Sequence, residues 1–317
     1  MWEVMKIVKP KKLSKGDLIG IISPASSPDD LTRIELGVRY FEKLGYKVEV
    51  GKNVGKVHGY LAGTNEERLD DLHYMFKKKE VKAIICVRGG YGSPRLLDKI
   101  DYKLIGANPK IFVGYSDITA LQMAFLQKTG LVTFAGPMVA VDFYNEVSPF
   151  TEEIFWELIT SKKSFGKVIL PDEEKLFALN KGNIKGRIIG GNLALIASLL
   201  GTDYFPSVKD KILFLEDVSE PPYRIDRMLN QLRLAKVLNQ ASGIILGAFV
   251  DCNETDPTKK TLTLGEVIGD YFGGLDVPIV YNYSHGHIKN NITIPFGIMF
   301  KLNASRSYVE ITESAVS

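Results

Sequence analysis

Strand-like apolar runs alternate with amphipathic helical segments from residue 17 to about residue 140, and this alternation limits the possible folds most strongly. Strands are expected at 17–22, 46–50, 81–87 and 110–114, and helices at 29–44, 64–76 and 118–128. Thr64 and Glu67 form a capping-box pattern at the start of the second helix. Repeated strand, helix, strand units form a parallel sheet, which binds ligands beyond the carboxyl ends of its strands. The sequence therefore predicts an α/β unit with a site at that edge.

The remainder of the chain predicts a second unit. A chain of 317 residues is longer than most domains that have a single hydrophobic core. Between 151 and 185 the pattern changes to Lys- and Glu-rich segments with Pro171, which predicts a linker. Further strands are expected at 211–215, 244–250 and 278–281, and helices at 193–200 and 224–234. We therefore expect domains at 1–150 and 186–317, joined by a linker at 151–185.

Composition excludes several classes of protein. Hydrophobic residues make up 45% of the chain and charged residues 24%, which is typical of globular proteins, and the net charge of +3 argues against a dedicated nucleic-acid surface. No apolar run is long enough for a secretory signal or a membrane span, so a cytoplasmic protein is expected. Four histidines and two cysteines without metal-ligand spacing predict no metal site, and Cys86 is expected to be a buried free thiol.

A serine stands at a predicted turn from strand to helix. In Gly114-Tyr115-Ser116-Asp117 the serine follows the strand at 110–114 and precedes the helix at 118–128. A hydroxyl at such an exposed elbow faces free backbone N–H groups, which stabilise an oxyanion. The nucleophile-elbow pattern has a second glycine two residues after the serine, and this chain lacks it. The alternative role for Ser116 is that of a helix cap.

Catalysis by serine also needs a base and an acid that orients it. His285 and His287 follow a strand in a glycine-containing loop and are preferred over His58 and His73. The alternative is that both are surface residues of a turn. Glu216 and Asp217 come directly after the strand at 211–215 and are the candidate acids. Their alternative role is to form surface ion pairs with Arg224 and Arg227.

Gly89 and Gly90 follow another predicted strand, in the segment Arg88-Gly-Gly-Tyr-Gly92. Backbone amides of a glycine turn can bind an oxyanion, and they can also cradle a phosphate. The Walker lysine and the full Gly-x-Gly-x-x-Gly spacing are both missing, which weakens the nucleotide interpretation.

Several motifs stand out together: 59–68 (GYLAGTNEER), 88–93 (RGGYGS), 114–117 (GYSD), 186–193 (GRIIGGNL), 213–227 (LFLEDVSEPPYRIDR) and Gly286-His287. In combination they resemble the LD-carboxypeptidase family of serine peptidases, which includes muramoyltetrapeptide carboxypeptidases and microcin C self-immunity peptidases. The resemblance covers about residues 13 to 310.

The resemblance implies a Ser, Glu, His triad of Ser116, Glu216 and His287, with the amides of Gly90 and Asp117 as oxyanion donors. Arg88, Gly89, Tyr91 and His285 are expected to contact the substrate, although relatives have an apolar residue at the position of His285. The implied fold is an N-terminal parallel-sheet domain, flavodoxin-like or amidotransferase-like, with a smaller C-terminal α/β domain. Homodimers are usual in such proteins.

The resemblance implies a cytoplasmic serine carboxypeptidase that releases the terminal D-alanine from murein tetrapeptides during peptidoglycan recycling, with a small peptide as its partner. No metal or organic cofactor is expected, and neither nucleic acid nor membrane. One alternative is a self-immunity-type peptidase that hydrolyses aminoacyl or peptidyl nucleotide analogues. An alternative of another class is a non-catalytic module that binds a nucleotide or a sugar.

Overall fold

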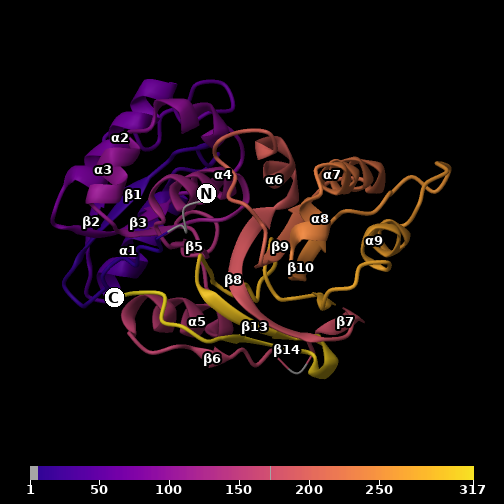
Figure 1. Ribbon diagram of the computed structural model, residues 1–317. Helices are drawn as coiled ribbons and strands as arrows, with labels where there is room; N and C mark the ends of the chain where they lie inside the picture. Colours follow the sequence, from indigo (N-terminus) through magenta and orange to yellow (C-terminus); the bar gives the residue numbers. More distant parts are fainter. Residues whose placement is uncertain (1–5, 172) are drawn as a thin grey trace.

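The protein is built from two β-sheets that lie side by side, each with helices packed against it (Figure 1). The computed structural model describes residues 6–171 and 173–317. The first half of the chain, indigo to purple in Figure 1, forms most of one sheet, and later segments form the other. This arrangement confirms the predicted α/β class.

The first sheet has six strands in the order β12-β5-β4-β3-β1-β2, and all are parallel except β12. These strands are β1 (Leu18–Ile22), β2 (Lys47–Val50), β3 (Val81–Cys86), β4 (Ile111–Val113), β5 (Thr133–Ala135) and β12 (Ile294–Phe296). The helices of this part are α1 (Thr32–Lys43), α2 (Asn65–Lys77), α3 (Tyr102–Ala107), α4 (Thr119–Thr129) and α5 (Pro149–Thr160), with the 3₁₀ helices η1 (Ser93–Lys99) and η2 (Ser116–Ile118). The capping box is confirmed: Thr64 and Glu67 each accept a hydrogen bond from the backbone of the other.

The second sheet has eight strands in the order β6-β14-β13-β8-β9-β10-β11-β7. Its four central strands are parallel, and the flanking strands are antiparallel. The strands are β6 (Gly166–Lys167), β7 (Phe177–Asn180), β8 (Asn183–Asn192), β9 (Lys211–Val218), β10 (Gly243–Val250), β11 (Ile279–Tyr281), β13 (Met299–Asn303) and β14 (Tyr308–Ile311). The other elements are α6 (Leu193–Leu199), α7 (Pro222–Leu234), α8 (Val237–Gln240), α9 (Leu264–Phe272) and η3 (Ala304–Arg306).

Residues 151–185, expected as a linker, contain regular structure. They include most of α5 and the edge strands β6 and β7, which pair with β14 and β11. Both strands are short and largely exposed, so they lack the apolar alternation by which a sequence identifies a strand. The domain boundaries at 150 and 186 stay a prediction.

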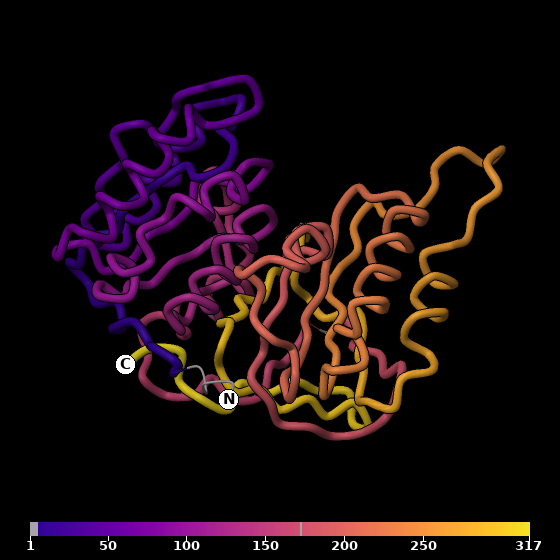
Figure 2. Tube along the Cα trace, turned by 45° about the horizontal axis from the view of Figure 1, so that its top comes forward, coloured from indigo at the N-terminus to yellow at the C-terminus, as the bar shows by residue number. Residues whose placement is uncertain are grey.

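Segments far apart in sequence complete each part. Strand β12 lies late in the chain and yet pairs with β5 at the edge of the first sheet. The Ser317 amide donates to the Pro10 carbonyl at 2.8 Å, so the C-terminal residue lies beside the start of the described chain. The chain between β10 and α9 projects away from the body, as the orange trace in Figure 2 shows. Cys86 and Cys252 are free and buried, as predicted for Cys86.

Candidate active site

Ser116 stands on a strained turn between β4 and α4. Its φ angle is 62°, in the left-handed region that residues other than glycine rarely adopt and that is concentrated at functional sites. A Cβ added to Gly114 would lie 2.9 Å from Cγ2 of Ile118, so the sharp turn requires glycine there. Ile118 occupies the position of the second glycine of the elbow pattern. We call residues 114–119 the serine elbow; its serine is half-buried rather than fully exposed.

The glycine turn, residues 88–92, packs directly against this elbow. A Cβ added to Gly89 would lie 2.9 Å from Cβ of Ser116, 3.1 Å from its Oγ and 3.3 Å from the Asp117 nitrogen. Gly90 is exposed with a φ angle of 101°. Asp117 is in the first turn of a helix, where backbone N–H groups have no intrahelical acceptor. Two backbone segments with amides available to a ligand therefore meet beside the serine.

The Asp117 side chain fastens the glycine turn to the serine elbow. Its carboxylate is 1% exposed and accepts hydrogen bonds from the amides of Gly92 at 3.2 Å and Ser93 at 2.8 Å. The Ser93 hydroxyl donates in return to the Asp117 carbonyl. Burial raises the pKa of Asp117, although the Ser93 and Gly92 bonds oppose that rise.

His287 and Glu216 form a hydrogen-bonded pair. Nδ1 of His287 lies 3.1 Å from Oε2 of Glu216, whose side chain is 1% exposed. A carboxylate can only accept, so Nδ1 carries the proton and Nε2 of the neutral ring is left as a base. Burial by itself would lower the pKa of His287, but the hydrogen bond and the charge of Glu216 raise it above its ordinary value.

Two glycines let the histidine segment lie close to this acid. A Cβ added to Gly286 would stand 3.0 Å from Oε2 of Glu216, and one added to Gly247 would stand 2.6 Å from the His285 carbonyl. Gly286 also has a φ angle of 139°. We call residues 282–291 the histidine loop. A larger residue at either glycine would push this loop away from Glu216.

Tyr115 links the serine elbow to the histidine loop. Its ring is buried and meets the His287 ring edge to face, with centroids 5.2 Å apart. The imidazole therefore lies beside the residue that precedes Ser116, although the two side chains come from different sheets. Asp142 stands near the same rings: it accepts from the Met138 amide at 2.8 Å, and burial raises its pKa to about 6.

A direct polar contact also joins the two sheets at this point. The Asn192 amide, at the end of β8, donates to Oγ1 of Thr119 at 3.1 Å. A Cβ added to Gly191 would lie 2.6 Å from that hydroxyl. Asn192 pairs in register with Glu216 on β9, so the helix that follows the serine contacts β8, the neighbour of the strand that carries the acid.

His285 lies inside the protein rather than with the exposed groups. It is 1% exposed, its Nδ1 donates to the Ile292 carbonyl, and its ring meets Phe214 and Tyr115 edge to face at centroid distances of 5.1 Å and 6.2 Å. Burial lowers the pKa of His285. The structure therefore gives the two histidines of the loop different surroundings and brings only His287 to Glu216.

Asp217, the other candidate acid, faces away from the imidazole. Its carboxylate accepts from Nδ2 of Asn192 and from the Ala194 amide, both at 3.0 Å, and so caps α6. Burial raises the pKa of Asp217 to about 7. Both acidic residues lie within the last residues of β9 rather than after it, and alternation along the strand directs their side chains apart.

The remaining predicted residues line the glycine turn or lie elsewhere. Arg88 is half-buried and donates to the Ser27 carbonyl at 3.3 Å. Tyr91 is 52% exposed and meets the ring of Tyr60 edge to face at 5.3 Å. His73 accepts a hydrogen bond from the Asp101 amide on the outer side of α2.

Sequence reasoning missed the side chains that hold the histidine loop. Glu174 accepts from the Ser284 hydroxyl and from Nδ2 of Asn290, the latter at 2.7 Å. Ser148 donates to Oδ1 of Asn290 at 2.7 Å, and the Thr151 hydroxyl accepts from the Asn291 amide at 2.7 Å. These contacts span more than a hundred residues of sequence, and no local motif marks them.

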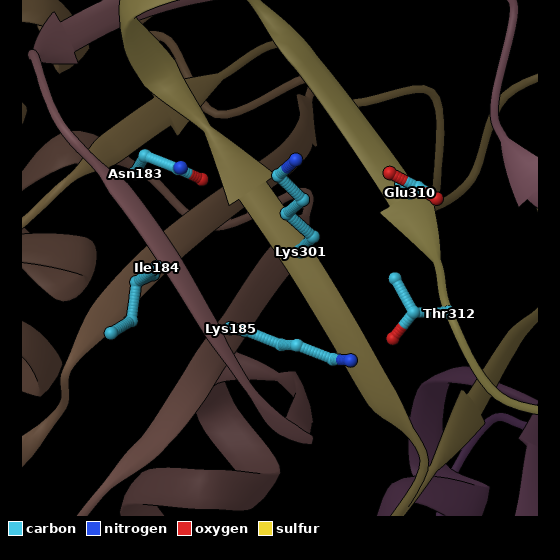
Figure 3. Close-up of a pocket in the computed structure, with 6 residues that line it drawn as sticks. All are labelled: Asn183, Ile184, Lys185, Lys301, Glu310 and Thr312. Carbon is cyan, nitrogen blue, oxygen red and sulfur yellow. The ribbon is translucent and has the colours of Figure 1, made fainter.

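The residues that the structure describes hold no cluster of His, Cys, Asp and Glu that could bind a metal ion, and none of their helices has the length and apolarity to cross a membrane. A cavity of about 480 Å³ opens over β8, β13 and β14 (Figure 3), lined by Asn183, Ile184, Lys185, Lys301, Glu310 and Thr312. Because it lies at the end of β8 opposite to Asn192, it is separate from the serine elbow.

Two sheets that meet at a serine elbow and a His–Glu pair define a two-part α/β protein with a candidate serine-nucleophile site. The chain matches the LD-carboxypeptidase N-terminal domain over residues 19–136 and the LD-carboxypeptidase C-terminal domain over residues 185–302. The protein belongs to the LD-carboxypeptidase family, which confirms the resemblance seen in the sequence.

Individual relatives cover nearly the whole chain. A protein of Bacillus subtilis named "Probable murein peptide carboxypeptidase" is 40% identical over 98% of this chain and 95% of its own length. A solved structure of the microcin C7 self-immunity protein MccF has a TM-score of 0.88 at 29% identity, covering 98% of this chain and 100% of the other. The muramoyltetrapeptide carboxypeptidase of Oxalobacter formigenes has a TM-score of 0.81 at 30% identity, covering 92% and 97%.

Proposed function

We propose that this protein is a serine LD-carboxypeptidase that releases the terminal D-alanine from murein tetrapeptides. The main support is the His287–Glu216 pair beside the serine elbow, with 3.1 Å between Nδ1 and Oε2 and 5.2 Å between the His287 and Tyr115 rings. Family membership and relatives named murein peptide and muramoyltetrapeptide carboxypeptidase support the same reaction.

In the proposed reaction, Oγ of Ser116 attacks the carbonyl carbon between an L-configured residue and D-alanine while Nε2 of His287 takes the hydroxyl proton. The amides of Gly90 and Asp117 bind the oxyanion of the tetrahedral intermediate. Collapse of that intermediate expels D-alanine, whose amine receives the proton from His287, and leaves an acyl ester on Ser116. Water, activated by the same imidazole, then hydrolyses the ester. Glu216 keeps the proton on Nδ1 throughout and stabilises the imidazolium.

A second candidate substrate is an aminoacyl or peptidyl nucleotide analogue. It is favoured by the similarity to MccF, for which complexes with aspartyl sulfamoyl adenosine and glutamyl sulfamoyl guanosine have been solved. The same three side chains would serve that reaction, because a serine nucleophile, its base and the orienting acid are common to acyl transfers. We further propose a cytoplasmic homodimer that acts on small peptides in peptidoglycan recycling.

The test compares wild type with Ser116→Ala on tetrapeptides that end in lysyl-D-alanine or diaminopimelyl-D-alanine. Loss of the nucleophile should lower the rate of D-alanine release by about 10⁵- to 10⁶-fold. Ser198→Ala is the matched control, because this exposed hydroxyl bonds only within α6, to the Leu195 carbonyl. Release by Ser116→Ala at the wild-type rate would reject the assignment.

A parallel assay with aspartyl sulfamoyl adenosine separates the two substrates. Hydrolysis of the peptide alone supports the murein reaction, and hydrolysis of the nucleotide analogue alone supports the self-immunity reaction. If the protein binds ATP or a muramic sugar but hydrolyses neither compound, it is a non-catalytic binding module.

A further inference from the structure

Arg68 is a buried cation that the proposed reaction does not use. It lies in the first turn of α2 and is 1% exposed. Its guanidinium donates from Nη1 to the carbonyls of Pro24 at 2.7 Å and Gly92 at 2.8 Å, and from Nη2 to Oδ1 of Asn65 at 2.7 Å. Burying an arginine is costly, so each of these acceptors compensates for lost water.

The two carbonyl acceptors of Arg68 belong to segments that follow two different strands. Pro24 is in the loop after β1, and Gly92 ends the glycine turn after β3. Gly92 is held from both sides, because its N–H donates to Oδ1 of Asp117 while its carbonyl accepts from Arg68. Arg68 and Asp117 together thus form a clamp on Gly92, which belongs to the turn that supplies the Gly90 amide.

The fit between Arg68 and the turn depends on a glycine. A Cβ added to Gly92 would lie 2.9 Å from Nη1 of Arg68 and 2.4 Å from Cδ2 of Leu61, and the φ angle of Gly92 is 122°. Ser26 also holds the turn: its Oγ accepts from the Tyr91 amide at 3.1 Å, and its own amide donates to the Gly89 carbonyl at 3.2 Å. The turn therefore has a defined position rather than that of a free loop.

The charge of Arg68 also matters for the oxyanion. Asp117 carries a buried carboxylate next to its own amide, and a negative charge there opposes a second negative charge on the substrate. Arg68 stands on the far side of the Gly92 peptide, and its positive charge favours the ionised form of Asp117. The cation thus offsets the carboxylate that the oxyanion would otherwise face.

We propose that Arg68 is a positioning residue for the oxyanion site: its Nη1, which donates to the carbonyls of both Pro24 and Gly92, fixes the glycine turn, and its charge offsets Asp117. The inference rests on the proposed function and adds a residue to its machinery. Arg68 touches neither the serine nor the histidine, so its effect should fall on the transition state and leave the His287–Glu216 pair unchanged.

The experiment compares Arg68→Lys with Arg95→Lys as the matched control. Lysine at 68 keeps the charge but loses the planar guanidinium, in which the Nη2 bond to Asn65 holds Nη1 between the two carbonyls. Arg95 is an exposed arginine just after the same turn. We expect Arg68→Lys to lower kcat by about 10- to 100-fold with KM within about threefold, because a misplacement near 1 Å costs up to about 100-fold. The acid limb of the kcat/KM profile should not move, and Arg95→Lys should stay within about twofold of wild type.

A transition-state mimic gives an independent readout. A peptide boronic acid, with boron in place of the scissile carbonyl carbon, adds to Ser116 and presents an oxygen to the same amides. Its affinity for Arg68→Lys should fall by a factor similar to the loss in kcat/KM. Folding of each variant is followed by circular dichroism, and rates are expressed per folded molecule.

Each outcome of these experiments either supports or overturns the proposed role of Arg68. A folded Arg68→Lys with kcat within twofold of wild type, or with a loss in KM alone, overturns it. If Arg68→Lys does not fold, Asn65→Ala tests the proposed role instead, because it removes one acceptor of the guanidinium from a half-buried position. A loss in kcat of about threefold or more supports the clamp, and a smaller loss overturns it. A wild type that releases no D-alanine rejects the proposed function and this role together, whereas an active wild type with equally active variants rejects this role alone.

Discussion

The serine elbow and the histidine loop are held in place in opposite ways. The elbow is built from a strand, a turn and a helix that are consecutive in sequence, and its neighbour is the glycine turn of the adjacent strand β3. The histidine loop is fastened by Glu174, Ser148 and Thr151, which lie 110 to 142 positions earlier in the chain. One half of the candidate site is thus set locally, and the other depends on the completed tertiary structure.

The forces that hold the nucleophile therefore differ from those that hold the base. At the elbow, backbone strain at Ser116 and the missing side chain of Gly89 fix the nucleophile within one supersecondary unit. At the loop, several hydrogen bonds, each of about 1–2 kcal/mol and two of them to the Glu174 carboxylate, together hold His287 against Glu216. Substitutions at the loop should therefore have graded effects.

The largest effect is expected when the comparison is made within the loop, between its two histidines. His287→Ala should lower kcat/KM for D-alanine release by about 10⁵- to 10⁶-fold, because the base paired with Glu216 is removed. His285→Ala should destabilise the fold by about 2–4 kcal/mol through a cavity beside Phe214 and an unpaired Ile292 carbonyl. Per folded molecule its kcat should change by no more than about tenfold.

Steady-state kinetics and denaturant unfolding of both variants measure this contrast. An inactive, well-folded His285→Ala beside an active His287→Ala would reverse the choice of base.

A smaller effect is expected from the acid. Glu216→Gln should lower kcat by about 10⁴-fold, because the amide can hold the wrong tautomer of His287. The pH profile supplies a second readout. Catalysis needs the neutral imidazole, so activity is lost as pH falls through the His287 pKa, which Glu216 raises above 6.5. Without that charge the acid limb should move to lower pH. An acid limb that does not move would show that Glu216 does not set the protonation of the base.

The smallest effect is expected from Glu174, whose contacts position the histidine loop over a long sequence distance. Glu174→Gln removes the charge and one of the two acceptors that bind Ser284 and Asn290. The loosened loop should lower kcat by about fivefold, with no change in the Ser116 elbow. Glu173→Gln is the matched control, because Glu173 is exposed and adjacent. Kinetics at saturating peptide measure both variants, and equal rates would mean that Glu174 does not hold the loop.

Much of the first sheet could be predicted from the sequence because its signals are local. Buried strands read as continuous apolar runs, and Thr64 with Glu67 marks the start of α2 within four residues. Ser116 could be singled out for the same reason, since a glycine, a serine and a following helix are adjacent in sequence.

The contacts that join the sheets could not be predicted in this way. The short edge strands β6 and β7 carry no alternating pattern, and the partners of the histidine loop are ordinary polar residues whose meeting depends on the whole fold. The local pattern also leaves both Glu216 and Asp217 as candidate acids, and only the family resemblance distinguishes Glu216; in the structure the extent of β9 determines which carboxylate turns toward the imidazole.

Strand β12 has a consequence for how the molecule is made. Only a few residues after His287, the polypeptide crosses back and pairs with β5 in the sheet of the nucleophile. Until that late segment leaves the ribosome, β5 presents a bare edge of amide and carbonyl groups that could template a foreign strand. The nucleophile half is therefore not an autonomous module that evolution or an engineer could detach, because its sheet is complete only after residue 296 has been synthesised.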